Sequence, residues 1–217
     1  MRLERIEFGA LLSYSPYGIE KDAEISRSVR TAVKNDEFVI SESKQVQMSE
    51  LLGELVASTR GKLPFDHLFD SYPMLVPIPS SSLMKADSLW VPERIALALQ
   101  RRKLGKVAGC LTRINPLPKS ATSLPSDRST AAQHYDSLGV QKLLSEPESI
   151  LLVDDVVTQG ATLLGAANRL ADAYPIARIA GFAAIRTVST PSVFKGMYES
   201  VVGLITLQAS GRTLRKP

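Results

Sequence analysis

The stretch ILLVDDVVTQGATLL, residues 150 to 164, constrains the fold more than any other part of the sequence. Four large apolar residues come first, and an unbroken apolar run is typical of a strand buried on both faces of a parallel sheet. Two carboxylates follow, Asp154 and Asp155, and a short loop, TQGAT, then leads into a helical pattern. Ligands of open α/β sheets bind at the carboxyl ends of the strands, which is where this order places both acids.

Strands and helices alternate along the rest of the chain, which predicts an α/β fold with a mainly parallel central sheet flanked by helices. The predicted strands are residues 6–14, 73–79, 107–111, 149–154, 178–185 and 200–207. The predicted helices are residues 26–34, 44–58, 91–104 and 160–173.

Residues 114–148 interrupt this alternation, because they hold few apolar residues and several chain breakers. The segment is longer than an ordinary connection inside a domain. We interpret it as a flexible lid that contains a helix from Asp127 to about Tyr135. A disordered surface insertion is the alternative.

The composition of the 217 residues, 44% hydrophobic and 22% charged, is that of a globular chain with a sizeable core. The net charge of +4 favours anionic partners, either a phosphorylated metabolite or nucleic acid. Nucleic acid is possible but not favoured, since the sequence has no lysine-rich tail and no basic stripe interleaved with aromatic residues. The single cysteine, Cys110, excludes an internal disulfide, and His67 and His134 are too few for a metal cluster.

No apolar run approaches the ~20 residues that span a bilayer, so no membrane segment is expected. The first residues, MRLERIEF, alternate charged and apolar side chains and lack the apolar core of a signal peptide. The sequence therefore predicts a cytoplasmic protein.

The residues around the acid pair point to a sugar phosphate as ligand. Carboxylates accept hydrogen bonds, so Asp154 and Asp155 suit the vicinal diol of a ribose or a hydrated cation. Gly160 lets the backbone approach an anion, and the helix that begins there directs free N–H groups at the loop. Thr158 and Thr162 add hydroxyl groups. An ordinary strand, turn and helix with capping threonines and a solvated acid pair is the alternative.

Other nucleotide-binding patterns do not fit. The segment lacks the G-x-x-x-x-G-K-[ST] of nucleotide triphosphatases and the G-x-G-x-x-G of dinucleotide folds. ILLVDDVVTQGATL instead closely resembles the motif with which type I phosphoribosyltransferases bind phosphoribosyl diphosphate (PRPP): four apolar residues, two acids, two apolar residues and a T-T-G-x-T-like loop. Gln159 stands where a second threonine is usual.

The resemblance extends over roughly residues 72 to 187 to the competence-protein ComF branch of that family. VPIPSSSLMKADSLW is similar to its V-P-x-P strand and pyrophosphate loop, and ERIALALQRRKLG to the helix that follows. Two features of the branch are missing from this sequence. It has no cysteine-rich zinc element near its start, and the G-F-N-Q stretch of the branch reads LWVP. The acceptor side of the family pattern therefore cannot be transferred.

The resemblance implies a single Rossmann-like domain over residues 1–217, with residues 1–65 as an N-terminal hood and residues 114–148 as the lid. It also implies a PRPP-dependent transferase that moves the phosphoribosyl group to or from a nitrogenous acceptor and releases pyrophosphate. Mg²⁺, the expected cofactor, would be carried by PRPP near Asp154 and Asp155. A homodimer is usual in such families.

The resemblance further implies a role for each matched residue. Asp154 and Asp155 would hold the ribose hydroxyls. The 5′-phosphate would bind to Thr158, Gln159, Gly160, Ala161 and Thr162. Pyrophosphate would contact Ser80, Ser81, Ser82 and Lys85. The further basic residues expected near the reaction are Arg113 and Lys119, predicted as catalytic, and Arg128, predicted on the lid.

Alternatively, each of these basic residues is a solvated charge on the surface without a role in the site. His134 and Tyr135 either face the site or serve in capping and packing. Three functions remain open at this stage: an active PRPP-dependent transferase, a catalytically silent sensor of PRPP or nucleotides, and a ComF-like protein of DNA uptake or DNA metabolism. The acceptor stays unidentified. Acceptor selectivity in such a fold lies in segments outside the shared motif, and residues 1–65 and 188–217 contain no recognisable motif.

Overall fold

The computed structural model describes residues 1–83, 87–118 and 128–217. One seven-stranded sheet runs through the molecule in the order β11-β10-β1-β9-β8-β4-β5. The parallel part comprises β1 (Arg5–Tyr14), β9 (Arg178–Thr187), β8 (Ser149–Val157), β4 (Met74–Pro77) and β5 (Lys106–Val107). The antiparallel part comprises β10 (Val201–Leu207) and β11 (Thr213–Lys216). The predicted α/β fold with a mainly parallel sheet is confirmed.

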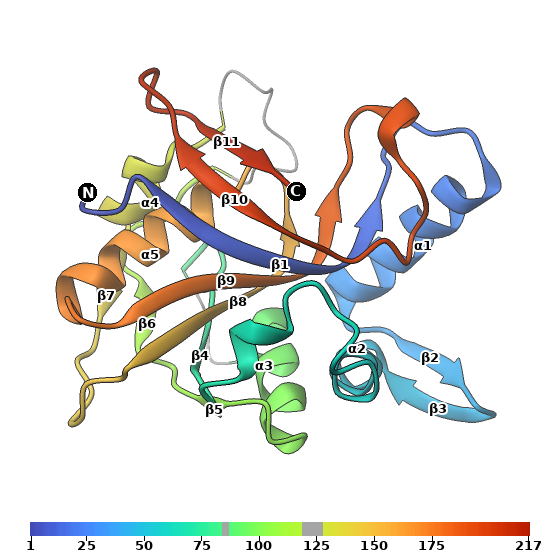
Figure 1. The fold of residues 1–217 in the computed structure, drawn as a ribbon, viewed down its shortest axis with the longest axis horizontal. Coiled ribbons are helices and arrows are strands. Elements are labelled where there is room, and N and C mark those ends of the chain that lie inside the picture. Colours follow the sequence, from blue (N-terminus) through green and yellow to red (C-terminus); the bar gives the residue numbers. More distant parts are fainter. Residues whose placement is uncertain (84–86, 119–127) are drawn as a thin grey trace.

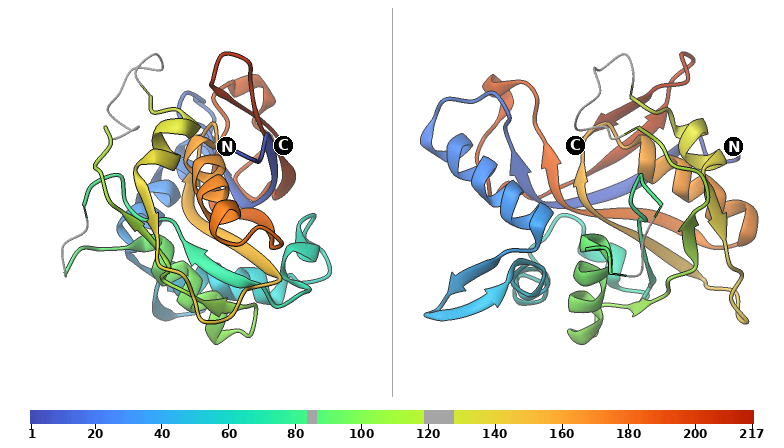
Figure 2. Two further views of the ribbon diagram at one scale, coloured as in Figure 1. Left: turned by 90° about the vertical axis from the view of Figure 1, so that its left-hand side faces the viewer. Right: turned by 180° about the vertical axis from the view of Figure 1, so that it is seen from behind.

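Helices cover both faces of this sheet (Figures 1 and 2). One face packs against α1 (Lys21–Asn35), α2 (Met48–Ser58) and α3 (Val91–Arg101). The other packs against α4 (Ala131–Asp136) and α5 (Ala161–Ala173). Alternate residues of β8 enter the two cores, Leu151 and Val153 on one side and Ile150 and Leu152 on the other. This double burial is why the strand needs a continuous apolar run.

The first strand of the predicted hood, residues 1–65, lies inside the central sheet. β1 pairs in parallel with β9 and antiparallel with β10, and its Phe8 is fully buried. Helices α1 and α2 of the same segment pack on the sheet face formed in part by β8. The segment therefore supplies part of the main core rather than a separate hood.

Two local predictions were wrong. Residues 44–47 do not begin a helix but form β3 (Lys44–Gln47), which pairs with β2 (Phe38–Ser41) in a hairpin. The turn between them places Glu42 and Ser43 at φ values of 47° and 65°, and a two-residue turn with both residues left-handed favours a hairpin. The strand predicted at 107–111 is divided between β5 and β6 (Leu111–Arg113).

The described part of residues 114–148 is folded. Helix α4 begins with a capping box in which Thr130 and Gln133 exchange hydrogen bonds, and β7 (Leu138–Val140) pairs antiparallel with β6. Because α4 packs against α5, this part of the segment is fixed to the body of the fold. Lys119 and Asp127 lie outside the described residues.

Candidate functional site

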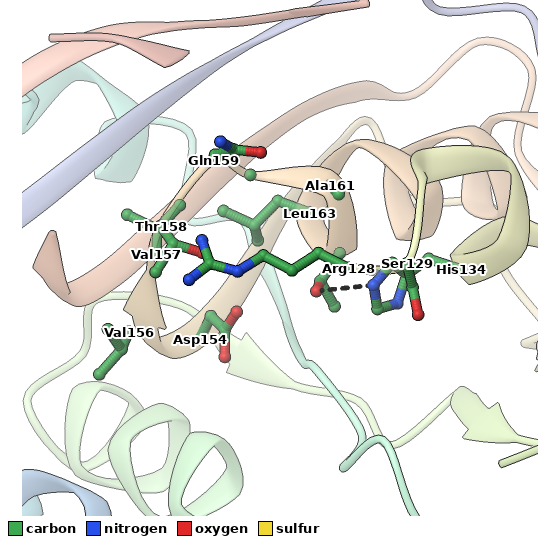
Figure 3. A pocket seen from close by; sticks show the side chains of 12 residues that line it. Arg128, Ser129, His134, Asp154, Val156, Val157, Thr158, Gln159, Ala161 and Leu163 are labelled. Atoms are coloured by element: carbon green, nitrogen blue, oxygen red, sulfur yellow. Dashed lines mark hydrogen bonds between the residues drawn. The ribbon is translucent and has the colours of Figure 1, made fainter. Parts of the chain in front are cut away.

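The site lies where β8 ends and α5 begins, at the carboxyl edge of the parallel strands. A pocket there is bounded on one side by the end of β8 and the first residues of α5, and on the other by a short segment that enters α4 (Figure 3). Its lining residues are Asp154, Val156, Val157, Thr158, Gln159, Gly160, Ala161, Thr162 and Leu163 on the first side and Arg128, Ser129 and His134 on the second. All five residues predicted to hold the 5′-phosphate are therefore in this pocket.

Gly160 sets the geometry of the 158–162 loop. Its φ of +85° lies in the left-handed region that favours glycine, and it stands at the position just before α5. No side chain caps α5 within the described part of the chain, so the N–H groups of its first turn stay open to a ligand. An uncapped helix start beside a pocket is a ready site for an anion.

The structure also gives a reason for Gly160 that the sequence does not reveal. A Cβ at this position would lie 2.5 Å from Cδ1 of Ile205, a buried residue of β10. A side chain here would therefore meet the core before it met an anion. The glycine serves packing as well as the loop conformation.

The two acids are not equivalent. The Asp155 carboxylate forms an ion pair of 2.8 Å with Lys34 of α1, while Asp154 Oδ1 accepts a hydrogen bond of 2.9 Å from the Asp155 backbone N–H. Burial raises the pKa of Asp154 to about 8, and the neighbouring charge of Asp155 adds to the shift. This shift favours the protonated form of Asp154, whereas the carboxylate of Asp155 has the Lys34 ammonium as its partner.

Arg113, predicted as catalytic, is buried and braces other segments. Its Nε donates to the backbone oxygen of Ser80 over 2.9 Å, and its Nη1 donates to the hydroxyl of Ser137. Burial lowers the pKa of its guanidinium, although the nearby Asp154 opposes the shift. Among the described residues it does not line the pocket, and its contacts make it a link between the residues after β4 and those after α4.

The serines predicted to contact pyrophosphate, Ser80 to Ser82, begin three residues after the last residue of β4, Pro77. Strand β4 pairs with β8, so these serines start from the same sheet edge as the acids. Ser82 N–H donates to Ser80 Oγ over 3.2 Å, and the Ser81 carbonyl accepts from Leu117 N–H over 2.8 Å. Lys85, the fourth residue of this predicted contact, lies outside the described residues, as does Lys119.

His134 and Tyr135 have different positions although they are neighbours. His134 is buried, lines the pocket and lies with its Nε2 3.3 Å from Thr162 Oγ1. Burial, reinforced by the positive charge of Arg113, lowers the pKa of His134 to about 4, so its ring is neutral at physiological pH. Tyr135 instead donates a hydrogen bond of 2.5 Å to Asp172 on the surface of α5.

Three residues near the site escaped sequence reasoning: Lys34, Ser129 and Arg215. Arg215 of β11 donates to the carbonyl oxygens of Thr158 and Thr187, each over 2.5 Å, and so braces the 158–162 loop from behind. Burial lowers the pKa of Arg215 to about 10. No local pattern marks any of the three, because each is an ordinary polar residue until the fold brings it to the loop.

The described residues contain no group of three or more histidine, cysteine or acidic side chains able to enclose a metal ion. Asp154 and Asp155 nevertheless offer carboxylate oxygens, the ligand type that Mg²⁺ prefers. Two adjacent carboxylates, one of them paired with Lys34, fit an ion that is held mainly by phosphate oxygens of a ligand.

Comparisons with known proteins do not identify the chain. It matches no model of a protein family, and no curated protein is significantly similar to it. Over the described residues, no helix has the length and apolar character needed to cross a membrane. Any functional assignment therefore depends on the residues of the site and their geometry.

Proposed function

We propose that the protein is a PRPP-dependent phosphoribosyltransferase, which transfers the phosphoribosyl group to or from a small nitrogenous acceptor with release of pyrophosphate. The observation that carries the proposal is the uncapped start of α5 directly after an acid pair at the end of a doubly buried parallel strand. A phosphate held at the helix start would place a ribose near Asp154 and Asp155. We expect the protein to act in the cytoplasm, with a homodimer as its working state.

The proposed reaction forms a bond between the acceptor nitrogen and the anomeric carbon and breaks the bond from that carbon to pyrophosphate. Positive charge develops on the sugar, so a carboxylate at the ribose hydroxyls stabilises the transition state. The carboxylate of Asp155 is the one that pairs with Lys34, over 2.8 Å. Bound Mg²⁺ would supply positive charge to the departing pyrophosphate.

The ends of the substrate would be held by separate segments. The 158–162 loop suits the 5′-phosphate, because its helix offers free N–H groups. Ser80 to Ser82 suit the pyrophosphate, since they leave the neighbouring strand at the same sheet edge. Arg113 joins this serine segment to Ser137, and we expect it to hold the segment in position.

One observation favours a second candidate, a PRPP or nucleotide sensor without turnover. The Lys34–Asp155 ion pair ties the acid pair to α1, so a ligand that competes for Asp155 would also loosen that helix. A sensor needs such a link between its ligand and a distant element, whereas an enzyme does not.

The deciding experiment mixes the protein with PRPP, Mg²⁺ and a panel of nitrogenous bases and measures pyrophosphate release. The transferase predicts release that depends on one class of acceptor and disappears in the Asp154→Asn/Asp155→Asn variant. Binding of PRPP with altered hydrogen exchange in α1 but no release with any base would favour the sensor. No binding of PRPP to the folded protein would contradict both.

A further inference from the structure

The pocket has a second wall that the sequence motif does not contain. We call it the facing wall and define it as Arg128, Ser129 and His134, which line the pocket together with the 158–162 loop. In Figure 3 the Arg128 side chain extends toward Thr158 and Asp154, and Ser129 lies beside His134. Ser129 and His134 are only 7% and 3% exposed. The segment that carries them comes more than twenty residues before the loop in the sequence.

Each residue of the facing wall has a buried polar atom without a partner among the described residues. These atoms are Arg128 Nε, Ser129 Oγ and His134 Nδ1. Buried polar atoms in folded proteins are nearly always hydrogen-bonded, so orphaned atoms on one pocket wall need an explanation. A ligand that bonds to them is the simplest one.

The packing that holds this wall is tight. A Cβ on Gly165 of α5 would lie 2.5 Å from the carbonyl oxygen of Ala131 and 2.6 Å from the Cβ of His134. Only a glycine at that position lets α4 approach α5 so closely. The approach brings His134 to Thr162 in the first turn of α5, the contact drawn as a dashed line in Figure 3.

The orphaned atoms suit an acceptor-rich ligand. Arg128 Nε is a donor only, a serine hydroxyl can donate, and a neutral histidine has one N–H. When His134 Nε2 accepts from the Thr162 hydroxyl, its Nδ1 carries the proton and donates as well. Three residues with such donors line the same pocket as the helix start, and a phosphate monoester offers oxygens enough to accept from both.

We propose that Ser129 and His134, together with Arg128, form the second half of a phosphomonoester site and bond to the phosphate oxygens that the 158–162 loop does not reach. This inference rests on the proposed function in that the ligand is a sugar phosphate. It goes beyond that function because it assigns binding to residues outside the PRPP-like motif.

Calorimetric titration with ribose 5-phosphate tests the proposal on Ser129→Ala and His134→Gln. Each variant should weaken binding roughly tenfold, the loss expected for one hydrogen bond to a charged group. Inorganic pyrophosphate, expected at Ser80 to Ser82, should bind as tightly as it does to the parent protein. Tyr135→Phe is the matched control, because this neighbour points to Asp172 and should leave both affinities unchanged.

Thermal unfolding of the ligand-free variants separates binding from structure. Removing an orphaned buried hydroxyl should leave the melting temperature of Ser129→Ala equal to that of the parent protein or above it, while ribose 5-phosphate affinity falls. A structural serine would lower the melting temperature and leave the affinity unchanged. Should His134→Gln fail to fold, the two measurements on Ser129→Ala still decide between binding and structure.

The outcomes also distinguish this inference from the proposed function. Parent-like ribose 5-phosphate affinity in both variants, with binding lost in the Asp154→Asn/Asp155→Asn protein, would overturn the facing wall and leave the proposed function standing. Weakened binding in both variants without pyrophosphate release on any base would support the wall and overturn the transferase. Absence of ribose 5-phosphate binding to the parent protein would overturn both.

Discussion

The two walls of the pocket are built in opposite ways. The wall formed by Asp154 to Thr162 is one continuous segment, and its main contribution is backbone: a left-handed glycine and the free N–H groups of a helix start. The facing wall consists of side chains on a separate segment, held by the packing of α4 on α5. A backbone-built wall should tolerate changes of side chain that do not alter the chain path. A wall built of side chains should not.

The largest effect is expected where the first wall does depend on side chains. Asp154→Asn with Asp155→Asn should sharply weaken PRPP binding, because each charge-assisted hydrogen bond lost costs roughly 1.5 to 3 kcal/mol. The fold should remain, since Asn resembles the protonated Asp154 in shape. Calorimetry measures the affinity and circular dichroism the fold. Unchanged PRPP affinity in the folded double variant would mean that the ribose lies elsewhere.

Gly160→Ala should be the next most damaging change. The new Cβ would meet Ile205, and a residue other than glycine in this left-handed conformation is strained, at about 1 to 3 kcal/mol. We therefore expect a lower melting temperature together with weaker ribose 5-phosphate binding. Packing against Ile205 thus adds a cost in stability to the approach of an anion that the sequence assigns to Gly160.

The Ile205→Ala background sharpens this test. The shorter side chain makes room for the added Cβ, so Gly160→Ala should cost less stability there than in the parent protein, which urea unfolding measures. Equal costs in the two backgrounds would show that the backbone conformation alone requires glycine.

Asp154 on the first wall and His134 on the facing wall should contribute to the free energy of unfolding with opposite dependence on pH. The folded-state pKa of Asp154, about 8, lies above its ordinary value of 3.8, so its contribution to stability falls as the pH rises from about 4 to 8. The folded-state pKa of His134, about 4, lies below its ordinary 6.5, so its contribution falls as the pH drops from 6.5 to 4.

Urea unfolding at several pH values measures these slopes. As the pH rises from 5 to 8, the free energy of unfolding of Asp154→Asn should increase relative to that of the parent protein. As the pH drops from 6.5 to 4, the free energy of unfolding of His134→Gln should increase relative to that of the parent protein. If the free energy of unfolding of a variant changes with pH in the same way as that of the parent protein, the substituted residue does not have the shifted pKa assigned to it.

The smallest effect is expected for Gln159→Thr, which restores the usual residue of the PRPP-like motif. Ribose 5-phosphate affinity should stay within roughly twofold, because the backbone of this loop supplies the main contacts. Competition binding detects so small a change. An affinity at least tenfold higher would mean that a hydroxyl at this position is a major contact. Side chains of this loop would then contribute more to binding than we infer.

Local pattern predicted the parts of the fold in which neighbouring residues share one environment. The apolar run of β8 reflects burial on both faces, and the periodic apolar residues after Gly160 form the buried side of α5. In such elements the same need for buried apolar side chains recurs over many residues, so the sequence predicts their existence and type. The hairpin of β2 and β3 was missed because three of the four residues of β3, KQVQ, are polar and the strand shows no alternation of buried and exposed residues.

The acid pair and the 158–162 loop were determined by the sequence itself, since nine consecutive residues carry both the chemistry and the chain path. Tertiary structure alone decided the rest of the site. Arg215 reaches the Thr158 carbonyl across 57 residues and His134 reaches Thr162 across 28. Sequence could not foresee these contacts, because a polar side chain gains its partner, its burial and its shifted pKa only when the sheet order and helix packing set its surroundings.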